Sequence, residues 1–268
     1  PRDPSSAASD VYKRQIFFSV SGDFEDFNAG TLNSSALTYT IGSNQVNVIR
    51  YLTASRALLI GTSGGEFVVR ASSDEPISPT NTQILRQASY GSANIQPVAV
   101  ANVVLFVQRA KRKLRELVYS FGSDSYFAPD LTILSENITE GLIKEIALQQ
   151  EPDNIVWCVL ENGKFVGMTY RREEEVVAWH DHEIGGTFTD SGTTYGYGFV
   201  ESVATIPSST GTEDEVYIVV ARTIGGATKR YIERLKPIDF GTNVEDAFFV
   251  DSGLTYSGSS ATTISGLT

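Results

Sequence analysis

Short apolar runs recur along the chain, and each run ends where turn-forming residues begin. Four of them, rich in β-branched and aromatic residues, occupy residues 57–62, 103–108, 155–160 and 216–221. Runs this short, bounded by turn signals, are typical of strands buried on both faces rather than of helices. After the third run, Asn162-Gly163 stands before another extended segment and predicts a tight hairpin. The hydrophobic pattern therefore predicts an all-β protein.

Each buried run belongs to a repeated unit, with an opening strand before it and a return strand after it. Opening strands are predicted at 46–52, 95–100, 143–148 and 200–206, and return strands at 66–71, 114–120, 165–170 and 229–235. Outer strands are predicted at 83–89, 176–181 and 247–251, and strands at 15–20 and 36–41 belong to an earlier unit. A short helix over 137–149 is the alternative to the third opening strand, because Ile138, Leu142 and Ile146 are spaced at four residues.

The length of the repeat predicts an architecture. With Leu59, Leu105, Trp157 and Ile218 as equivalent positions, the unit is about 45 to 60 residues long, close to the spacing of propeller blades. A four-stranded sheet with two apolar faces cannot bury both alone, whereas blades stacked around an axis cover each face with a neighbour. We therefore expect a β-propeller-like array of four-stranded antiparallel blades, incomplete at both ends.

Composition divides the chain into three segments. Residues 1–15 are polar and aperiodic, and residues 10–15 resemble the in-frame translation of a transposon adapter used to prepare sequencing libraries. We expect this segment to be a non-native or disordered leader on a fragment assembled from environmental DNA. Residues 16–240 are expected to form the propeller-like domain. Residues 241–268, rich in Ser, Thr and Gly, are expected to begin a further β element that is truncated.

Charge and cysteine content exclude some classes of protein. The formal net charge of −11 argues against a protein that grips nucleic acid, since affinity for DNA comes largely from Lys and Arg on phosphates. Cys158 is the single cysteine, so no intrachain disulfide is possible and packing must supply the stability. No apolar run approaches the roughly 18 residues that a membrane-spanning helix needs.

One basic cluster is a candidate contact surface. Arg109, Lys111, Arg112 and Lys113 occupy a predicted hairpin turn, where they are candidates for contact with DNA phosphate or an acidic partner. Solvated turns of this kind are also common, and that alternative stays open.

The two histidines of the chain form the other candidate site. His180 and His182 lie two residues apart on a predicted outer strand, so both imidazoles point the same way and could meet a metal ion. No third ligand can be assigned from the sequence, and exposed residues at a strand end are the alternative. No catalytic residue or cofactor site is predicted, because no Ser-His-Asp or Cys-His arrangement can be argued from the sequence.

Several stretches resemble tail proteins of tailed bacteriophages. They include LLIGTSGGEFVVR at 58–70, ISPTNTQILRQASYGS at 77–92, VLFVQRAKRKLREL at 104–117 and EPDNIVWCVLENGKFVGMTYRREEEVVAWHDH at 151–182. The resemblance is to the propeller-bearing tail nozzle, tail tubular and packaged-DNA stabilisation proteins of short-tailed phages. It implies a non-enzymatic structural subunit of the virion tail, in a homo-oligomeric ring that contacts portal or other tail proteins and touches DNA at most transiently.

A glycan-binding or glycoside-cleaving propeller, such as a receptor-binding tail protein, is the alternative function. Cleavage would need two carboxylates held about 5 to 10 Å apart, with exposed aromatic rings beside them. Trp157 and Trp179 are the best candidates for those rings. If both are packed between sheets, this alternative loses its main support.

Overall fold

The computed structural model describes residues 13–42, 47–72, 75–237, 239–244, 247, 258–259 and 261–263. Within these ranges the chain forms nineteen β-strands, and every pair of neighbouring strands is antiparallel. The predicted all-β class is therefore confirmed. No helix in this part of the chain is long and apolar enough to cross a membrane.

Three successive sheets each contain four strands in the order of the sequence. The first sheet consists of β3 (Ile49–Ala54), β4 (Leu58–Thr62), β5 (Gly65–Ala71) and β6 (Thr82–Ala88). The second consists of β7 (Val98–Val100), β8 (Val103–Val107), β9 (Leu114–Ser120) and β10 (Ser125–Phe127). The third consists of β11 (Ile143–Gln149), β12 (Ile155–Leu160), β13 (Phe165–Arg171) and β14 (Val176–His182). Short connections make each strand pair with its neighbours in the sequence.

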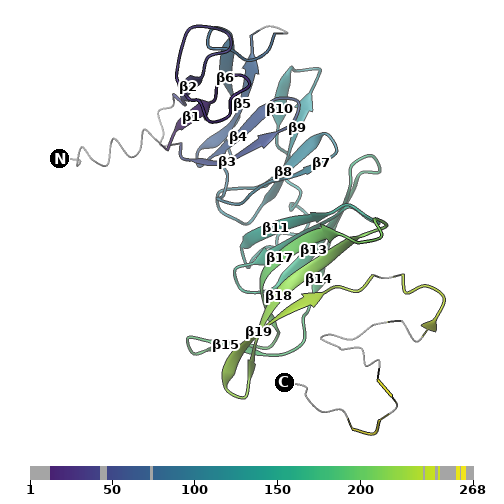
Figure 1. Ribbon diagram of the computed structural model, residues 1–268. Helices are drawn as coiled ribbons and strands as arrows, with labels where there is room; N and C mark the ends of the chain where they lie inside the picture. The colour runs from purple at the N-terminus through teal and green to yellow at the C-terminus, as the bar shows by residue number, and fades with distance from the viewer. Residues whose placement is uncertain are drawn as a thin grey trace.

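Three smaller groups of strands complete the described structure. The fourth sheet consists of β17 (Phe199–Pro207), β18 (Asp214–Ile224) and β19 (Ala227–Arg234). The two-stranded sheets are β1 (Gln15–Phe18) with β2 (Leu37–Thr40), and β15 (Phe188–Asp190) with β16 (Thr193–Tyr195). Figure 1 shows the first and second sheets towards one end of the molecule and the third and fourth sheets towards the other.

Successive sheets are joined by apolar cores that they share. Along β8, Val104 and Phe106 lie in the core with the first sheet, whereas Leu105 lies in the core with the third. Along β12, Cys158 lies in that same core with the second sheet, and Trp157 lies in the core with the fourth. Neighbouring residues of a strand point to opposite faces, so a strand covered on both sides must be apolar throughout. This packing explains the uninterrupted apolar runs.

The predicted strands are confirmed for the most part. The four buried runs form β4, β8, β12 and β18, which belong to four different sheets. The opening and return strands lie where they were expected, with their ends shifted by a few residues. The two early strands pair with each other as β1 and β2. The outer strand predicted at 247–251 lies outside the described residues, except for Ala247.

Two details differ from the sequence-based expectations. The helix over 137–149 is wrong, because turns lead into β11 at Ile143. Leu142 has a left-handed φ of 64°, and the Ile143 amide donates to the Lys111 carbonyl at 2.7 Å, so the chain joins a neighbouring turn instead of coiling. The second sheet also has a fourth strand, β10, that was not predicted. It is three residues long, and only Tyr126 in it is buried.

The predicted boundaries at the two ends of the chain lie mostly outside the described residues. Of the leader 1–15, residues 1–12 are not described, and Gln15 already begins β1. The carbonyl groups of Lys13 and Arg14 accept hydrogen bonds from the amides of Ile49 and Ile41, at 3.0 and 2.9 Å. Of the segment 241–268, only 241–244, 247, 258–259 and 261–263 are described.

Candidate functional site

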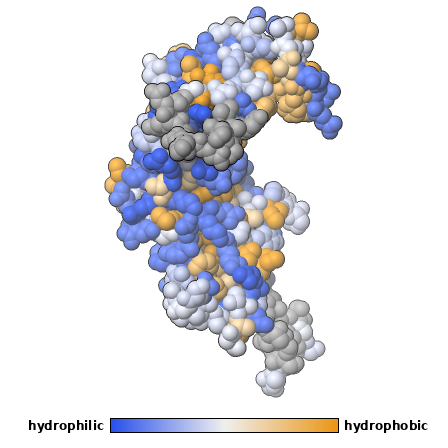
Figure 2. All heavy atoms as spheres, turned by 90° about the vertical axis from the view of Figure 1, so that its left-hand side faces the viewer, coloured by the Kyte–Doolittle hydropathy of each residue, from blue (hydrophilic) through white to orange (hydrophobic). Residues whose placement is uncertain are grey.

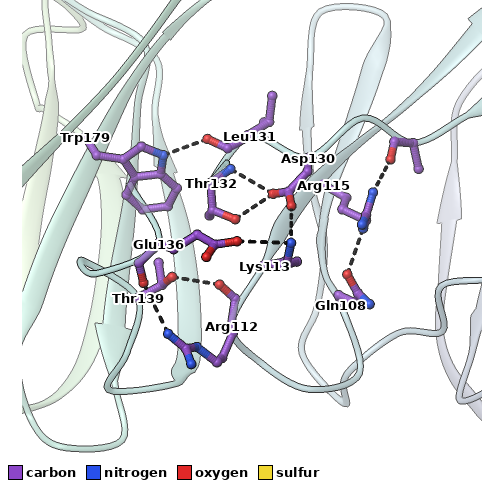
Figure 3. A network of polar contacts seen from close by, with 11 residues as sticks. Gln108, Arg112, Lys113, Arg115, Asp130, Leu131, Thr132, Glu136, Thr139 and Trp179 are labelled. Atoms are coloured by element: carbon purple, nitrogen blue, oxygen red, sulfur yellow. Dashed lines mark hydrogen bonds and ion pairs between the residues drawn. The ribbon is translucent and has the colours of Figure 1, made fainter. Parts of the chain in front are cut away.

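The predicted basic cluster lies in the turn between β8 and β9, where the second sheet faces the third. The turn is closed by its own backbone, since the Gln108 amide donates to the Lys113 carbonyl at 2.8 Å. Lys111 has a left-handed φ of 63°, and its amide donates to the Gln108 carbonyl at 2.7 Å. The turn and the acidic groups that meet it are called the polar seam below; these groups are Asp130, Glu136, Glu140 and Glu161. Figure 3 shows part of it.

Lys111 and Arg112 connect the turn to the third sheet and the segment before it. Lys111 Nζ lies 2.5 Å from a carboxylate oxygen of Glu161, which follows β12. Arg112 lies 3.8 Å from the Glu140 carboxylate, and its carbonyl accepts a hydrogen bond from the Thr139 hydroxyl at 2.7 Å. Lys111 therefore links the turn to the third sheet, and Arg112 links it to the segment that precedes that sheet.

Lys113 has the most enclosed acidic partner of the polar seam. Its Nζ lies 2.6 Å from Asp130, whose side chain is 10% exposed, and 3.4 Å from Glu136. Asp130 also accepts hydrogen bonds from the Thr132 amide at 2.9 Å and the Thr132 hydroxyl at 2.5 Å. Burial acts to raise the pKa of Asp130, but the hydrogen bonds from Lys113 and Thr132 outweigh it and lower the pKa. Hydrogen bonding to Asp130 likewise raises the pKa of Lys113.

Arg109 turns the other way, towards the first sheet. Its side chain donates to the Ser63 carbonyl at 3.5 Å, and its amide donates to the Gly91 carbonyl at 2.9 Å. The structure thus brings Lys111, Arg112 and Lys113 together with acids and separates Arg109 from them. Contact of these four residues with DNA or an acidic partner stays a prediction.

The arginine beyond the turn, Arg115, is buried between the first two sheets. Its guanidinium donates to Gln108 Oε1 at 2.8 Å and to the Ala128 carbonyl at 2.6 Å (Figure 3). It also lies 3.5 Å from the centre of the Tyr90 ring. A cation with two acceptors and an aromatic face beside it is satisfied without solvent.

A second cluster, around Glu66, was missed in the sequence. Glu66 on β5 has no exposed surface, and its Oε1 accepts a hydrogen bond from the Ser92 hydroxyl at 3.0 Å. Its Oε2 has no hydrogen-bond partner within the described ranges. Burial is the largest influence on this carboxyl group and raises its pKa. A glutamate at the start of a return strand shows no local sequence pattern that predicts its burial, because residues outside its own sheet cover it.

The two histidines lie against aromatic rings of the third sheet. His180 Nδ1 and His182 Nε2 are 2.7 Å apart, and the His182 ring lies 4.9 Å from that of Trp157. Burial lowers the pKa of both imidazoles, which favours a neutral pair that shares one hydrogen bond. Gly167 makes room for them, since a Cβ there would lie 2.2 Å from His180 Cε1. Across the described ranges, no three His, Cys, Asp or Glu side chains are grouped as a metal site would need.

The remaining residues singled out from the sequence are part of the cores. Trp157 is 4% exposed, and Trp179 packs against the core between the second and third sheets while its Nε1 donates to the Leu131 carbonyl at 2.9 Å. Cys158 has no exposed surface, and burial raises the pKa of its thiol. A thiol in that state is a poor nucleophile.

Comparisons with known proteins add little beyond these observations. No protein-family model and no curated protein matches the chain. Among solved structures, the chain is similar to an auxiliary nutrient binding protein from Bacteroides thetaiotaomicron VPI-5482, with a TM-score of 0.38 and 7% sequence identity. The match covers 75% of this chain and 49% of the nutrient binding protein. It is also similar to a luciferin-regenerating enzyme, with a TM-score of 0.39 and 12% sequence identity. That match covers 78% of this chain and 64% of the enzyme. The chain spans less than two thirds of either structure.

Proposed function

We propose that the chain is a non-enzymatic structural component of a bacteriophage virion tail, a nozzle or adaptor subunit that forms part of the DNA exit conduit. In this proposal the sheets are blades of a β-propeller-like array, and the subunits form a ring with portal or other tail proteins as neighbours. The proposal starts from the sequence stretches that resemble phage tail proteins. One structural observation supports it most: the second and third sheets are joined both by a shared core and by ion pairs.

The joints between sheets are suited to a subunit that transmits force. The second and third sheets share a core that contains Leu105 and Cys158, and the polar seam borders the same joint through Lys111 and Glu161. A further ion pair, between Arg172 after β13 and Glu116 of β9, crosses it as well. Apolar packing supplies most of the resistance to separation of the sheets, and the exposed ion pair between Lys111 and Glu161 adds little energy.

The distribution of charge is compatible with DNA that passes without being held. The net charge is −11, and Lys111, Arg112 and Lys113 face acids of the same chain. Figure 2 shows hydrophilic side chains over much of the face turned to the viewer, with smaller apolar areas between them. An acidic wall repels phosphate, which favours passage over binding.

The glycan-binding alternative loses the aromatic residues on which it depended. Trp157 is packed in the core between the third and fourth sheets, and Trp179 covers the core between the second and third. Trp157 is only 4% exposed, and Trp179 is partly buried, with its Nε1 bonded to the Leu131 carbonyl.

The proposal is tested on the full chain by native mass spectrometry and negative-stain electron microscopy over a range of protein concentrations. We expect closed rings with a central channel wider than duplex DNA. In filter-binding assays, duplex DNA should not be retained at physiological salt, because an acidic channel lacks the cations for stable binding. A chain that remains monomeric at every concentration, or that binds duplex DNA tightly under these conditions, would contradict the proposal.

A further inference from the structure

The connection between β1 and β2 exposes several large apolar side chains. This segment, residues 19–36, is called the aromatic loop below (Figure 1). Within it Phe24 is 86% exposed, Leu32 is 70% exposed and Phe27 is 54% exposed. Single apolar side chains are common on protein surfaces, but several in one short segment are typical of a surface that contacts a partner.

Hydrogen bonds hold the aromatic loop in one shape. The Ser21 amide donates to the Ser34 carbonyl at 3.0 Å and joins the two arms of the loop. In the first arm, the Val20 amide donates to the Asp26 carbonyl at 2.8 Å. The Asp26 side chain in turn accepts a hydrogen bond from the Asn28 amide at 2.8 Å. A loop that is already folded loses less conformational freedom when it binds.

Acidic side chains lie between the exposed rings. Asp23 and Glu25 flank Phe24, and Asp26 stands directly before Phe27. None of these three acids has an ion-pair partner among the described residues. No lysine or arginine occurs between residues 16 and 49. The aromatic loop therefore combines apolar contact area with negative charge that its own segment does not compensate.

This combination selects one kind of partner. Nucleic acid does not fit, because the loop has no cation for phosphate. A membrane does not fit either, because entry of Phe24 would carry Asp23 and Glu25 to the headgroups, where anionic lipids repel them. A second copy of the chain has a net charge of −11 and also repels an acidic loop. A basic protein surface has the complementary charge.

We infer that the aromatic loop docks on a basic protein whose contact surface is apolar at the centre and rimmed by lysine or arginine. Phe24 and Phe27 enter the apolar centre, and Asp23 and Glu25 meet the cations of the rim. Aromatic side chains at the centre of an interface supply most of the affinity, whereas charges at the rim set the rate of association and the choice of partner. This inference does not depend on the proposed tail function, which the ring assay decides separately.

The probe is a synthetic amphipathic helix of leucine and lysine, titrated into the full chain by isothermal calorimetry. A helix with glutamate in place of lysine and vesicles of phosphatidylcholine serve as comparisons. We expect the lysine helix to bind, with an affinity that falls as salt is added, and the two comparisons not to bind. Phe24→Ser should weaken binding about tenfold, because it removes a ring that is buried in the complex. Asp23→Asn should weaken it about two- to threefold.

Phe121→Ser and Glu173→Gln are the matched controls. Phe121 is 85% exposed directly after β9, and Glu173 is exposed in the turn between β13 and β14. Neither control should change binding of the lysine helix. Thermal unfolding should be the same for all four variants, because each replaced side chain is exposed.

Several results would overturn the inference. One is that the lysine helix does not bind, or that the glutamate helix or the vesicles bind as tightly. Another is that Phe24→Ser and Phe121→Ser weaken binding equally, or that Asp23→Asn and Glu173→Gln do so, because either result would indicate attraction that is not specific to the loop. Self-association of the chain that Phe24→Ser abolishes would assign the loop to a second copy instead.

Discussion

Replacing Glu66 by glutamine should stabilise the protein at alkaline pH and not at acidic pH. The Glu66 side chain is fully buried beside Tyr51 and Ser92, with one carboxylate oxygen bonded to Ser92 and the other without a partner within the described ranges. Burial raises the pKa of Glu66, although Ser92, the Tyr90 amide and the charge of Arg115 act against it. The same enclosure raises the pKa of the Tyr51 hydroxyl, mainly by desolvation.

The sign and the size of the effect follow from this environment. Because the folded-state pKa of Glu66 is raised, the folded protein binds the proton more tightly than the unfolded chain does. The contribution of Glu66 to stability is therefore complete below its unfolded pKa and is lost as the pH rises through its folded pKa. A buried charged oxygen without a partner costs about 1 to 3 kcal/mol. Glu66→Gln should recover an amount of that order at pH 8 and almost nothing at pH 4.

Urea unfolding of both proteins, followed by tryptophan fluorescence between pH 4 and pH 8, measures this difference. Glu173→Gln is the control, since Glu173 is exposed in the turn between β13 and β14. It should change the free energy of unfolding little at any pH. If Glu66→Gln were less stable than the parent at pH 8, the attraction between Glu66 and Arg115 would outweigh desolvation, and the reasoning would be refuted.

Two other substitutions test the packing and the polar seam. Asp130→Asn should lower the free energy of unfolding by roughly 1 kcal/mol at pH 7, because it removes the charge that Lys113 and Thr132 stabilise. Since the folded-state pKa of Asp130 is lowered, the parent should lose this advantage as the pH falls through that pKa, and unfolding curves at pH 7 and pH 3 should show the gap closing. Gly61→Ala should cost roughly 1 to 3 kcal/mol in thermal or urea unfolding, because its Cβ would lie 2.1 Å from a ring carbon of Tyr51. Gly122→Ala, where the Cβ meets nothing within 4 Å, should cost much less.

Much of the strand order could be predicted from the sequence, because strands covered on both faces leave uninterrupted apolar runs. Residues 103–107 and 155–160 are examples, and each forms one strand of the described structure. The helix over 137–149 was a wrong alternative, since a four-residue apolar spacing does not show that Leu142 adopts a left-handed turn. Strand β10 is too short to leave a pattern, and its place depends on its pairing with β9.

The polar contacts were much harder to predict, because their partners are distant in the sequence. Lys111 meets Glu161, and Glu66 meets Ser92, only after neighbouring sheets have packed together. A basic turn and a strand glutamate have the same local pattern whether they face solvent or another sheet. The candidate DNA-contact residues were therefore located correctly in a turn, while the ion pairs of Lys111, Arg112 and Lys113 could not be derived.

Strand β8 packs against two different sheets, because its successive side chains point to opposite faces of the second sheet. Leu105 and Phe106 are adjacent and fully buried on β8, and Phe106 lies 6.2 Å from the Tyr51 ring of the first sheet. Substitution of either by alanine should cost about 2 to 5 kcal/mol. The two variants should show increased hydrogen–deuterium exchange in different sheets. Phe106→Ala should raise exchange in β4 of the first sheet, whereas Leu105→Ala should raise it in β12 of the third. Increased exchange in the same sheet for both variants would contradict the account.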